Sequence, residues 1–137
     1  MATNTVGNYW KYKMLNNYVA KDFVILLMQP GFVFDKDAHL DYADISANEC
    51  ATANGYTKGT GLALTISAVS QDNTNDRGKI VFANVSFTPT PGNISLGGAL
   101  IWDLTDDIIV GYEDSEGTIT VNADQPYVFT NLEIRNN

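Results

Sequence analysis

The chain has 137 residues, of which 45% are hydrophobic and 18% are charged, and these values are typical of one globular domain rather than of a disordered chain. Its formal net charge of -8 at pH 7 makes the average surface repel phosphate backbones and anionic lipid headgroups. We therefore expect neither nucleic acid nor a membrane among its partners. The single cysteine, Cys50, excludes an intrachain disulfide, and no Cys/His cluster has the spacing of a zinc site.

The N-terminal 21 residues differ from the rest of the chain in charge. They contain three lysines and no acidic residue, so residues 1–21 carry +3 and residues 22–137 carry -11. Their polar and aromatic residues follow no clear period, which leaves two interpretations open, an extended arm and an irregular first strand. The apolar core of a signal peptide is also missing, so we expect a product that is made and stays soluble in the cytoplasm.

The next 50 residues predict a buried strand followed by a long loop. FVILLM (23–28) is a continuous apolar run that precedes a Pro-Gly turn dipeptide, as in a buried strand. The acidic, Ala-rich stretch 35–54 predicts a loop with one helical turn, capped by Asp44 or Ser46 and continuing through Glu49 and Cys50. LALTISAV (62–69) then alternates as one strand.

The second half predicts an antiparallel meander. GKIVFANVSF (78–87) has the pattern of a strand with an irregularity near Asn84, and the polar loop 71–78 before it has the pattern of a hairpin connection. The further strand-like segments are ISLGGALIWDL, IIVGY, TITV and YVFTNLEI. Seven to nine strands predict an all-β fold, a single-domain antiparallel β-sandwich or jelly-roll-like barrel over residues 22–137, with residues 1–21 as an extended N-terminal arm.

Each candidate for catalysis or metal binding has a simpler structural interpretation. His39 is the only histidine and no nucleophile motif accompanies it, so we expect a solvated loop residue. The loop from Asp72 to Asp76 places oxygen atoms at alternate positions, but it lacks the glycine and the bidentate glutamate of an EF-hand. The carboxylates between residues 103 and 116 lie in or beside predicted turns, where Asp is common. We therefore predict no enzymatic activity, no cofactor and no metal site.

Three segments carry a resemblance to a known family. They are FVFDKDAHLDYADISANECATANGYTKGTGLAL, DNTNDRGKIVFANVSFT and ALIWDLT, which together span about Phe32 to Thr105. In this order they resemble the small structural proteins encoded in the virion gene blocks of tailed bacteriophages. The resemblance implies a non-enzymatic virion protein, an auxiliary protein on the capsid surface that binds the major capsid protein and decorates or cements the shell.

Two functions remain open at this stage. The first is capsid decoration by a homo-oligomer, for which we expect a symmetric trimer, packed through FVILLM and the Gly97–Ala99 strand. The second is a tail- or fibre-associated module that binds a host-surface glycan through exposed aromatic residues such as Tyr56 or Tyr112.

The N-terminal arm is the predicted partner-binding segment. Aromatic anchors and lysines alternate in it at Tyr9, Trp10, Lys11, Tyr12 and Lys13, a composition suited to an acidic neighbouring surface. The alternative is that the arm folds back on its own acidic body. The docking interpretation predicts that deleting residues 2–20 leaves a folded domain that no longer binds particles.

Overall fold

The computed structural model describes residues 6–137, which are built mostly of β-strands. The strands are β1 (Phe23–Met28), β2 (Leu62–Ala63), β3 (Ile66–Asp72), β4 (Arg77–Phe82), β5 (Val85–Phe87), β6 (Ile94–Asp103), β7 (Ile108–Val121), β8 (Tyr127–Phe129) and β9 (Glu133–Asn136). The helical segments are α1 (Asn8–Asn16), α2 (Tyr42–Ile45) and the 3-10 helix η1 (Ser46–Asn48).

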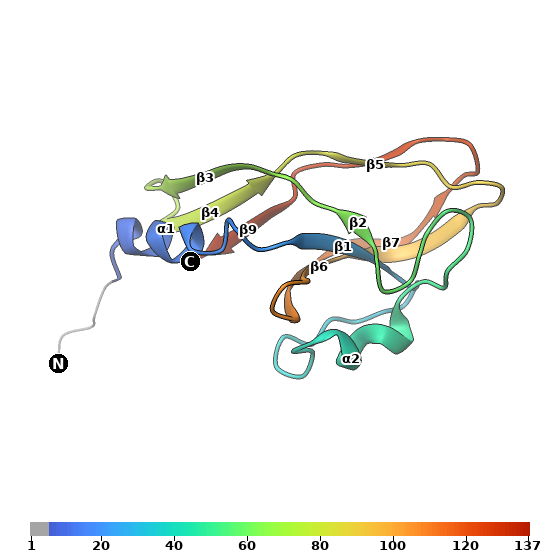
Figure 1. Ribbon diagram of the computed structural model, residues 1–137, viewed down its shortest axis with the longest axis horizontal. Helices are drawn as coiled ribbons and strands as arrows, with labels where there is room; N and C mark the ends of the chain where they lie inside the picture. The colour runs from blue at the N-terminus through green and yellow to red at the C-terminus, as the bar shows by residue number, and fades with distance from the viewer. Residues whose placement is uncertain (1–5) are drawn as a thin grey trace.

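The strands form three antiparallel sheets. A four-stranded sheet has the order β2-β1-β6-β7, a three-stranded sheet has the order β3-β4-β9, and β5 pairs with β8. Figure 1 shows β3, β4 and β9 beside α1 at one end of the molecule, while β5 and α2 lie on opposite sides of the four-stranded sheet. This sandwich-like single domain confirms the all-β fold predicted from the sequence.

Strand β1 is central because both of its faces are covered. Its odd-numbered side chains, from Phe23 to Leu27, pack in the main core between the sheets. Its even-numbered side chains, from Val24 to Met28, pack in a second core with α2 and the aromatic residues of the following loop. Neighbouring side chains of a strand point to opposite faces, so a strand buried on both faces reads as an uninterrupted apolar run. FVILLM is therefore the interior strand that its sequence predicts.

This burial corrects one expectation about assembly. All six residues of β1 are buried, and so are Gly97, Gly98 and Ala99 in β6. Neither segment is available for packing between subunits. The expectation that a trimer packs through these two segments is therefore wrong. The trimer itself stays a prediction.

The N-terminal segment differs from both of its expected forms, because residues 8–16 form helix α1. Leu15 is buried in the main core, and the helix backbone lies directly against β4. A Cβ atom at Gly78 would stand 2.8 Å from the backbone nitrogen of Tyr12, so glycine permits this close approach. A short helix gains most of its stability from such packing, and only one large aliphatic side chain of α1 is buried, so the sequence carries no helical period.

Four smaller predictions also need correction. The N-cap of α2 is Asp41, whose carboxylate accepts from the backbone of Asp44 while the Asp44 carboxylate accepts from the backbone of Asp41. Helix α2 ends at Ile45, so Glu49 and Cys50 lie beyond it. The expected single strand at residues 62–69 is divided into β2 and β3, whereas IIVGY and TITV belong to one long strand, β7.

Candidate functional site

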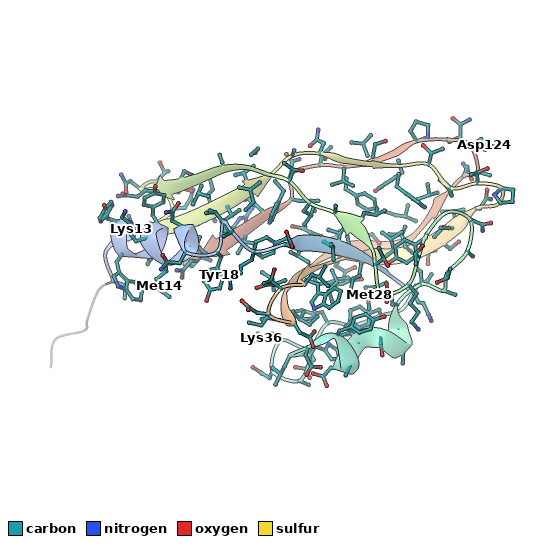
Figure 2. All side chains as sticks on the ribbon, in the orientation of Figure 1. Lys13, Met14, Tyr18, Met28, Lys36 and Asp124 are labelled. Atoms are coloured by element: carbon teal, nitrogen blue, oxygen red, sulfur yellow. The ribbon has the colours of Figure 1, made fainter. Side chains whose placement is uncertain are left out.

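The outward side of α1 exposes large aromatic and apolar side chains. Tyr9 is 60% exposed, Trp10 is 57% exposed and Met14 is 37% exposed, and Lys13 lies on the same side. Figure 2 shows Met14 and, just beyond the helix, Tyr18 pointing away from β3 and β4. We call Tyr9, Trp10, Lys13 and Met14 the α1 outer face. Contiguous exposed apolar side chains on a domain surface are a feature shared by many interaction sites.

The cation on this face is held close to aromatic rings. The ammonium nitrogen of Lys13 lies 5.5 Å from the ring centre of Tyr9 and 6.0 Å from that of Tyr12. The two rings are 6.0 Å apart and tilted with respect to each other. An ammonium group at such distances is attracted to the negative face of the ring. The α1 outer face therefore combines apolar area with one positive charge.

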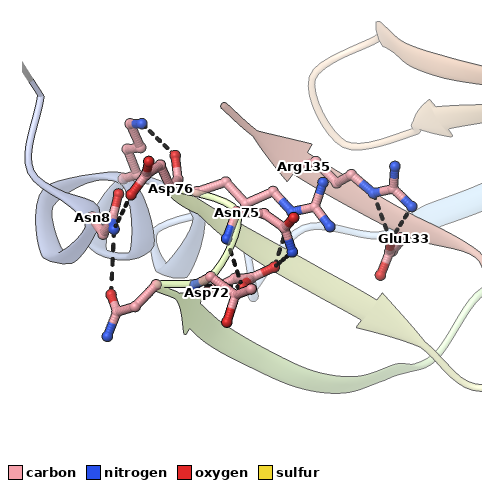
Figure 3. A network of polar contacts seen from close by, with 10 residues as sticks. Asn8, Asp72, Asn75, Asp76, Glu133 and Arg135 are labelled. Atoms are coloured by element: carbon pink, nitrogen blue, oxygen red, sulfur yellow. Dashed lines mark hydrogen bonds and ion pairs between the residues drawn. The ribbon is translucent and has the colours of Figure 1, made fainter.

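The other lysines of the segment contact the protein's own acidic body. The ammonium of Lys11 donates to the backbone oxygen of Asp76 at 2.5 Å, and the Asn8 amide donates to the side chains of Asn73 and Asp76 (Figure 3). Lys21 forms an ion pair with Asp106 at 2.9 Å, and this hydrogen bond raises the lysine pKa. The segment thus folds back on the acidic body, as the alternative interpretation held, but it does so as a helix.

The structure separates the five residues predicted to bind a partner. Tyr9, Trp10 and Lys13 are exposed, whereas Lys11 and Tyr12 are half-buried on the side toward β4. Their role in binding stays a prediction. Met14 was not predicted, because a helix brings residues 9, 10, 13 and 14 onto one side, whereas adjacent residues of a strand point to opposite faces. A helical interpretation of residues 8–16 would have found it.

Glu49 organises a second site, which is buried. The Glu49 side chain is inaccessible to solvent and accepts hydrogen bonds from the hydroxyl of Tyr56 at 2.6 Å and the hydroxyl of Tyr42 at 2.7 Å. The backbone N–H of Gly59 donates to it as well, at 2.9 Å. Burial and the bond to Glu49 raise the pKa of Tyr42 to about 12. A buried carboxylate with this many donors is satisfied, so the network holds the long loop together.

The same network removes Tyr56 from the candidate glycan-binding residues. Tyr56 is only 1% exposed, and its hydroxyl accepts from the backbone N–H of Leu27 at 2.9 Å while it donates to Glu49. The expectation of an exposed aromatic side chain at this position is wrong. The residue instead links the loop to β1.

Tyr112 and His39 belong to an aromatic cluster on the second core. The ring of Tyr112 lies 5.1 Å from that of Phe32 in a perpendicular arrangement, and the ring of His39 stacks on that of Phe32 at 5.5 Å. The Nδ1 atom of His39 accepts from the backbone N–H of Asp35 at 3.0 Å. His39 is thus half-buried, whereas the sequence predicted a solvated loop residue. The hydroxyl of Tyr112 is buried and has no hydrogen-bond partner within residues 6–137.

The acidic loops have turn chemistry. The Asp72 carboxylate accepts from Asn75 through its side chain and backbone and from the backbone of Thr74, and the Asn75 amide is the main cause of its lowered pKa. The Asp103 carboxylate accepts from the backbone of Thr105 and Asp106 at the β6–β7 turn. Both loops connect strands, as predicted. Within residues 6–137, no group of three or more potential metal ligands comes together.

Comparison with known proteins adds no relative. No protein-family model matches the chain, and neither a curated protein nor a solved structure matches it. In the described part of the chain, no helix has the length and apolar character required to cross a membrane.

Proposed function

We propose that the protein is a non-enzymatic structural protein of a tailed bacteriophage virion, a decoration protein that binds the outer surface of the major capsid shell and stabilises it. The resemblance of residues 32–105 to small virion proteins supports this class. The observation that carries the docking role is the exposure of Tyr9 and Trp10 on a helix that is fixed to the domain.

The α1 outer face is suited to docking because it is rigid. Leu15 fixes the helix in the core, and Asn8 and Lys11 fix its N-terminal turns to the β3–β4 hairpin. A pre-ordered surface loses little conformational entropy on binding. Tyr and Trp side chains are frequent among the residues that contribute most to binding energy. Lys13 suits a shell surface that carries carboxylates next to apolar groups.

The copy number of the protein in purified virions tests this proposal. A decoration protein is present in hundreds of copies, so a stained gel of virions should show it as a major band beside the major capsid protein. A handful of copies would instead favour the tail- or fibre-associated function. Absence from the virion would overturn the proposal.

A further inference from the structure

The two larger sheets leave two strand edges unpaired on the same side of the sandwich. β7 pairs only with β6, and β9 pairs only with β4. Among residues 6–137, no backbone hydrogen bond joins β7 to β9. From Val110 to Asp114, the backbone of β7 has no backbone partner outside the β6 ladder in the described chain. An edge of this kind presents free N–H and C=O groups to a further strand.

Three hollows follow one another along this edge. The first, of about 270 Å³, lies between α1 and the start of β7, and it is lined by Val110 and Ile134. The second, of about 290 Å³, lies between residues 110–113 of β7 and residues 133–135 of β9. Val110 and Ile134 line both the first and the second hollow. The third, of about 180 Å³, shares Glu113 with the second and reaches residues 127–132. Neighbouring hollows share lining residues, and we call the three together the β7–β9 groove.

Each hollow of the β7–β9 groove has apolar side chains among its lining residues, and carboxylates stand beside them. Side chains of the main core line the hollows; they are Phe23, Ile80, Ile101, Ile119, Phe129 and Leu132. Glu113 and Asp114 are exposed. Among the described residues, Arg135 is the one cation that lines the groove, and it forms an ion pair with Glu133. The free charge beside the groove is therefore negative.

We propose that the β7–β9 groove binds an extended segment of another protein, in which apolar residues alternate with Lys or Arg. Such a segment would add a strand along Val110–Asp114, with its backbone paired to β7. Because strand side chains alternate between faces, the apolar residues would enter the groove on the face that Glu113 shares with Ala99, and the basic residues would meet Asp114 on the opposite face. This inference does not depend on the proposed capsid function, and the α1 outer face is not part of it.

The same features argue against a second copy of this chain as the occupant. Two β7 edges would bring Glu113, Asp114 and Glu116 of both copies together, and like charges across a strand pair are destabilising. β7 also bulges: Asp114 pairs with Gly98 and Ile119 pairs with Leu96, so residues 115–118 face a single residue of β6. Charges and bulges on an edge are devices that prevent self-association. A strand that carries positive charge would not meet the repulsion between like charges.

A peptide-binding experiment tests the inference on the full-length protein. The probe is a labelled peptide of about ten residues that alternates Val and Lys, and the comparison peptide alternates Val and Glu. We expect saturable binding of the Lys peptide in fluorescence anisotropy and none of the Glu peptide. Hydrogen exchange should slow at the amides of residues 110–114 when the Lys peptide is bound.

Two charge reversals separate a specific site from general attraction. Asp114→Lys and Asp37→Lys change the net charge equally, and both wild-type side chains are exposed. We expect Asp114→Lys to weaken binding of the Lys peptide by about tenfold or more, and Asp37→Lys by less than about twofold. Equal losses in the two variants, protection outside residues 110–114 or no binding of the Lys peptide would each overturn the inference.

Discussion

Glu49 connects three distant points of the long loop through its carboxylate. Tyr42 precedes it, Tyr56 and Gly59 follow it, and all three donate hydrogen bonds to the same two oxygen atoms. Replacing Glu49 by Gln removes the negative charge that accepts these three hydrogen bonds. It also replaces one acceptor oxygen by an NH2 group, which then faces another donor. We expect the free energy of unfolding to fall by about 2–3 kcal/mol, as is usual for hydrogen bonds to a charged group.

Glu113→Gln is the matched control for this change. The substitution is chemically identical, but Glu113 is exposed and its side chain has no such network. Urea unfolding should place this variant within about 0.5 kcal/mol of the parent. If both variants unfold at the same urea concentration, Glu49 does not hold the loop.

Tyr112 provides a prediction of pH dependence. Burial, aided by the nearby carboxylate of Asp114, raises the pKa of Tyr112 to about 12 from its ordinary value of 10.0. The folded state therefore retains the proton while the unfolded state loses it. The resulting contribution to stability is fully present below pH 10 and is lost as the pH rises from 10 toward 12.

Tyr112→Phe should reduce this alkaline loss. The variant should also unfold at pH 7 with unchanged or slightly higher stability, because it removes a buried hydroxyl that has no partner in the described chain. Urea unfolding at a series of pH values checks both points, with Tyr9→Phe as the control at an exposed position. A clear loss of stability at pH 7 would show that the hydroxyl does have a partner.

At the scale of secondary-structure elements, the contact between α1 and β4 depends on Gly78. A methyl group there would stand 2.8 Å from the backbone nitrogen of Tyr12 and 2.9 Å from the backbone carbonyl of Lys11, and backbone atoms cannot move aside as a flexible side chain can. We expect Gly78→Ala to lower stability by about 1–3 kcal/mol and to loosen the helix. Urea unfolding and hydrogen exchange of α1 measure the two effects.

Gly111→Ala is the control for the same substitution in a strand. No atom lies within 4 Å of a Cβ atom built at Gly111, outside the glycine and its chain neighbours. The free energy of unfolding of the Gly111→Ala variant should stay within about 0.5 kcal/mol of the parent's, and hydrogen exchange in α1 should not change. A Gly78→Ala variant as stable as Gly111→Ala would mean that α1 does not pack as described.

The packing of α1 also changes what a deletion can test. Leu15 belongs to the main core, so removing residues 2–20 would open that core as well as remove the exposed aromatic residues. We therefore expect the truncated protein to be destabilised, contrary to the dispensable arm that the sequence suggested. Substitutions on the α1 outer face test docking without this complication.

These elements show what the sequence could and could not predict. β1 and the β3–β4 hairpin were predictable, because a continuous apolar run and a polar Asx-rich loop are local signals. Helix α1 was not, because most of its inward positions are polar or aromatic, as at Asn8 and Lys11, and its stability comes from packing on β4. The Glu49 site was not predictable from the sequence, because its hydrogen-bond donors come together only when the loop folds. Tyr56 was therefore mistaken for a surface residue.

At the scale of the whole molecule, folding brings two of the three N-terminal lysines into contact with the acidic body. Residues 1–21 carry +3 and the remainder carries -11, but Lys11 and Lys21 already contact the acidic body. Of the three lysines, Lys13 alone lies on the α1 outer face. We therefore expect docking to depend mainly on apolar contact, with only modest weakening by salt.

Rebinding to virions prepared without the protein tests the docking role of the α1 outer face most directly. The variant Tyr9→Ser/Trp10→Ser removes the two most exposed aromatic residues of that face, and Val33→Ser/Leu40→Ser removes two exposed apolar side chains elsewhere, which are 79% and 61% exposed. Equal melting temperatures of the parent and both variants would show that all three proteins are folded. We then expect the first variant to bind at least about tenfold more weakly than the parent, and the affinity of the second to stay within about twofold of the parent's. Rebinding of the Tyr9→Ser/Trp10→Ser variant with the affinity of the parent would contradict the account.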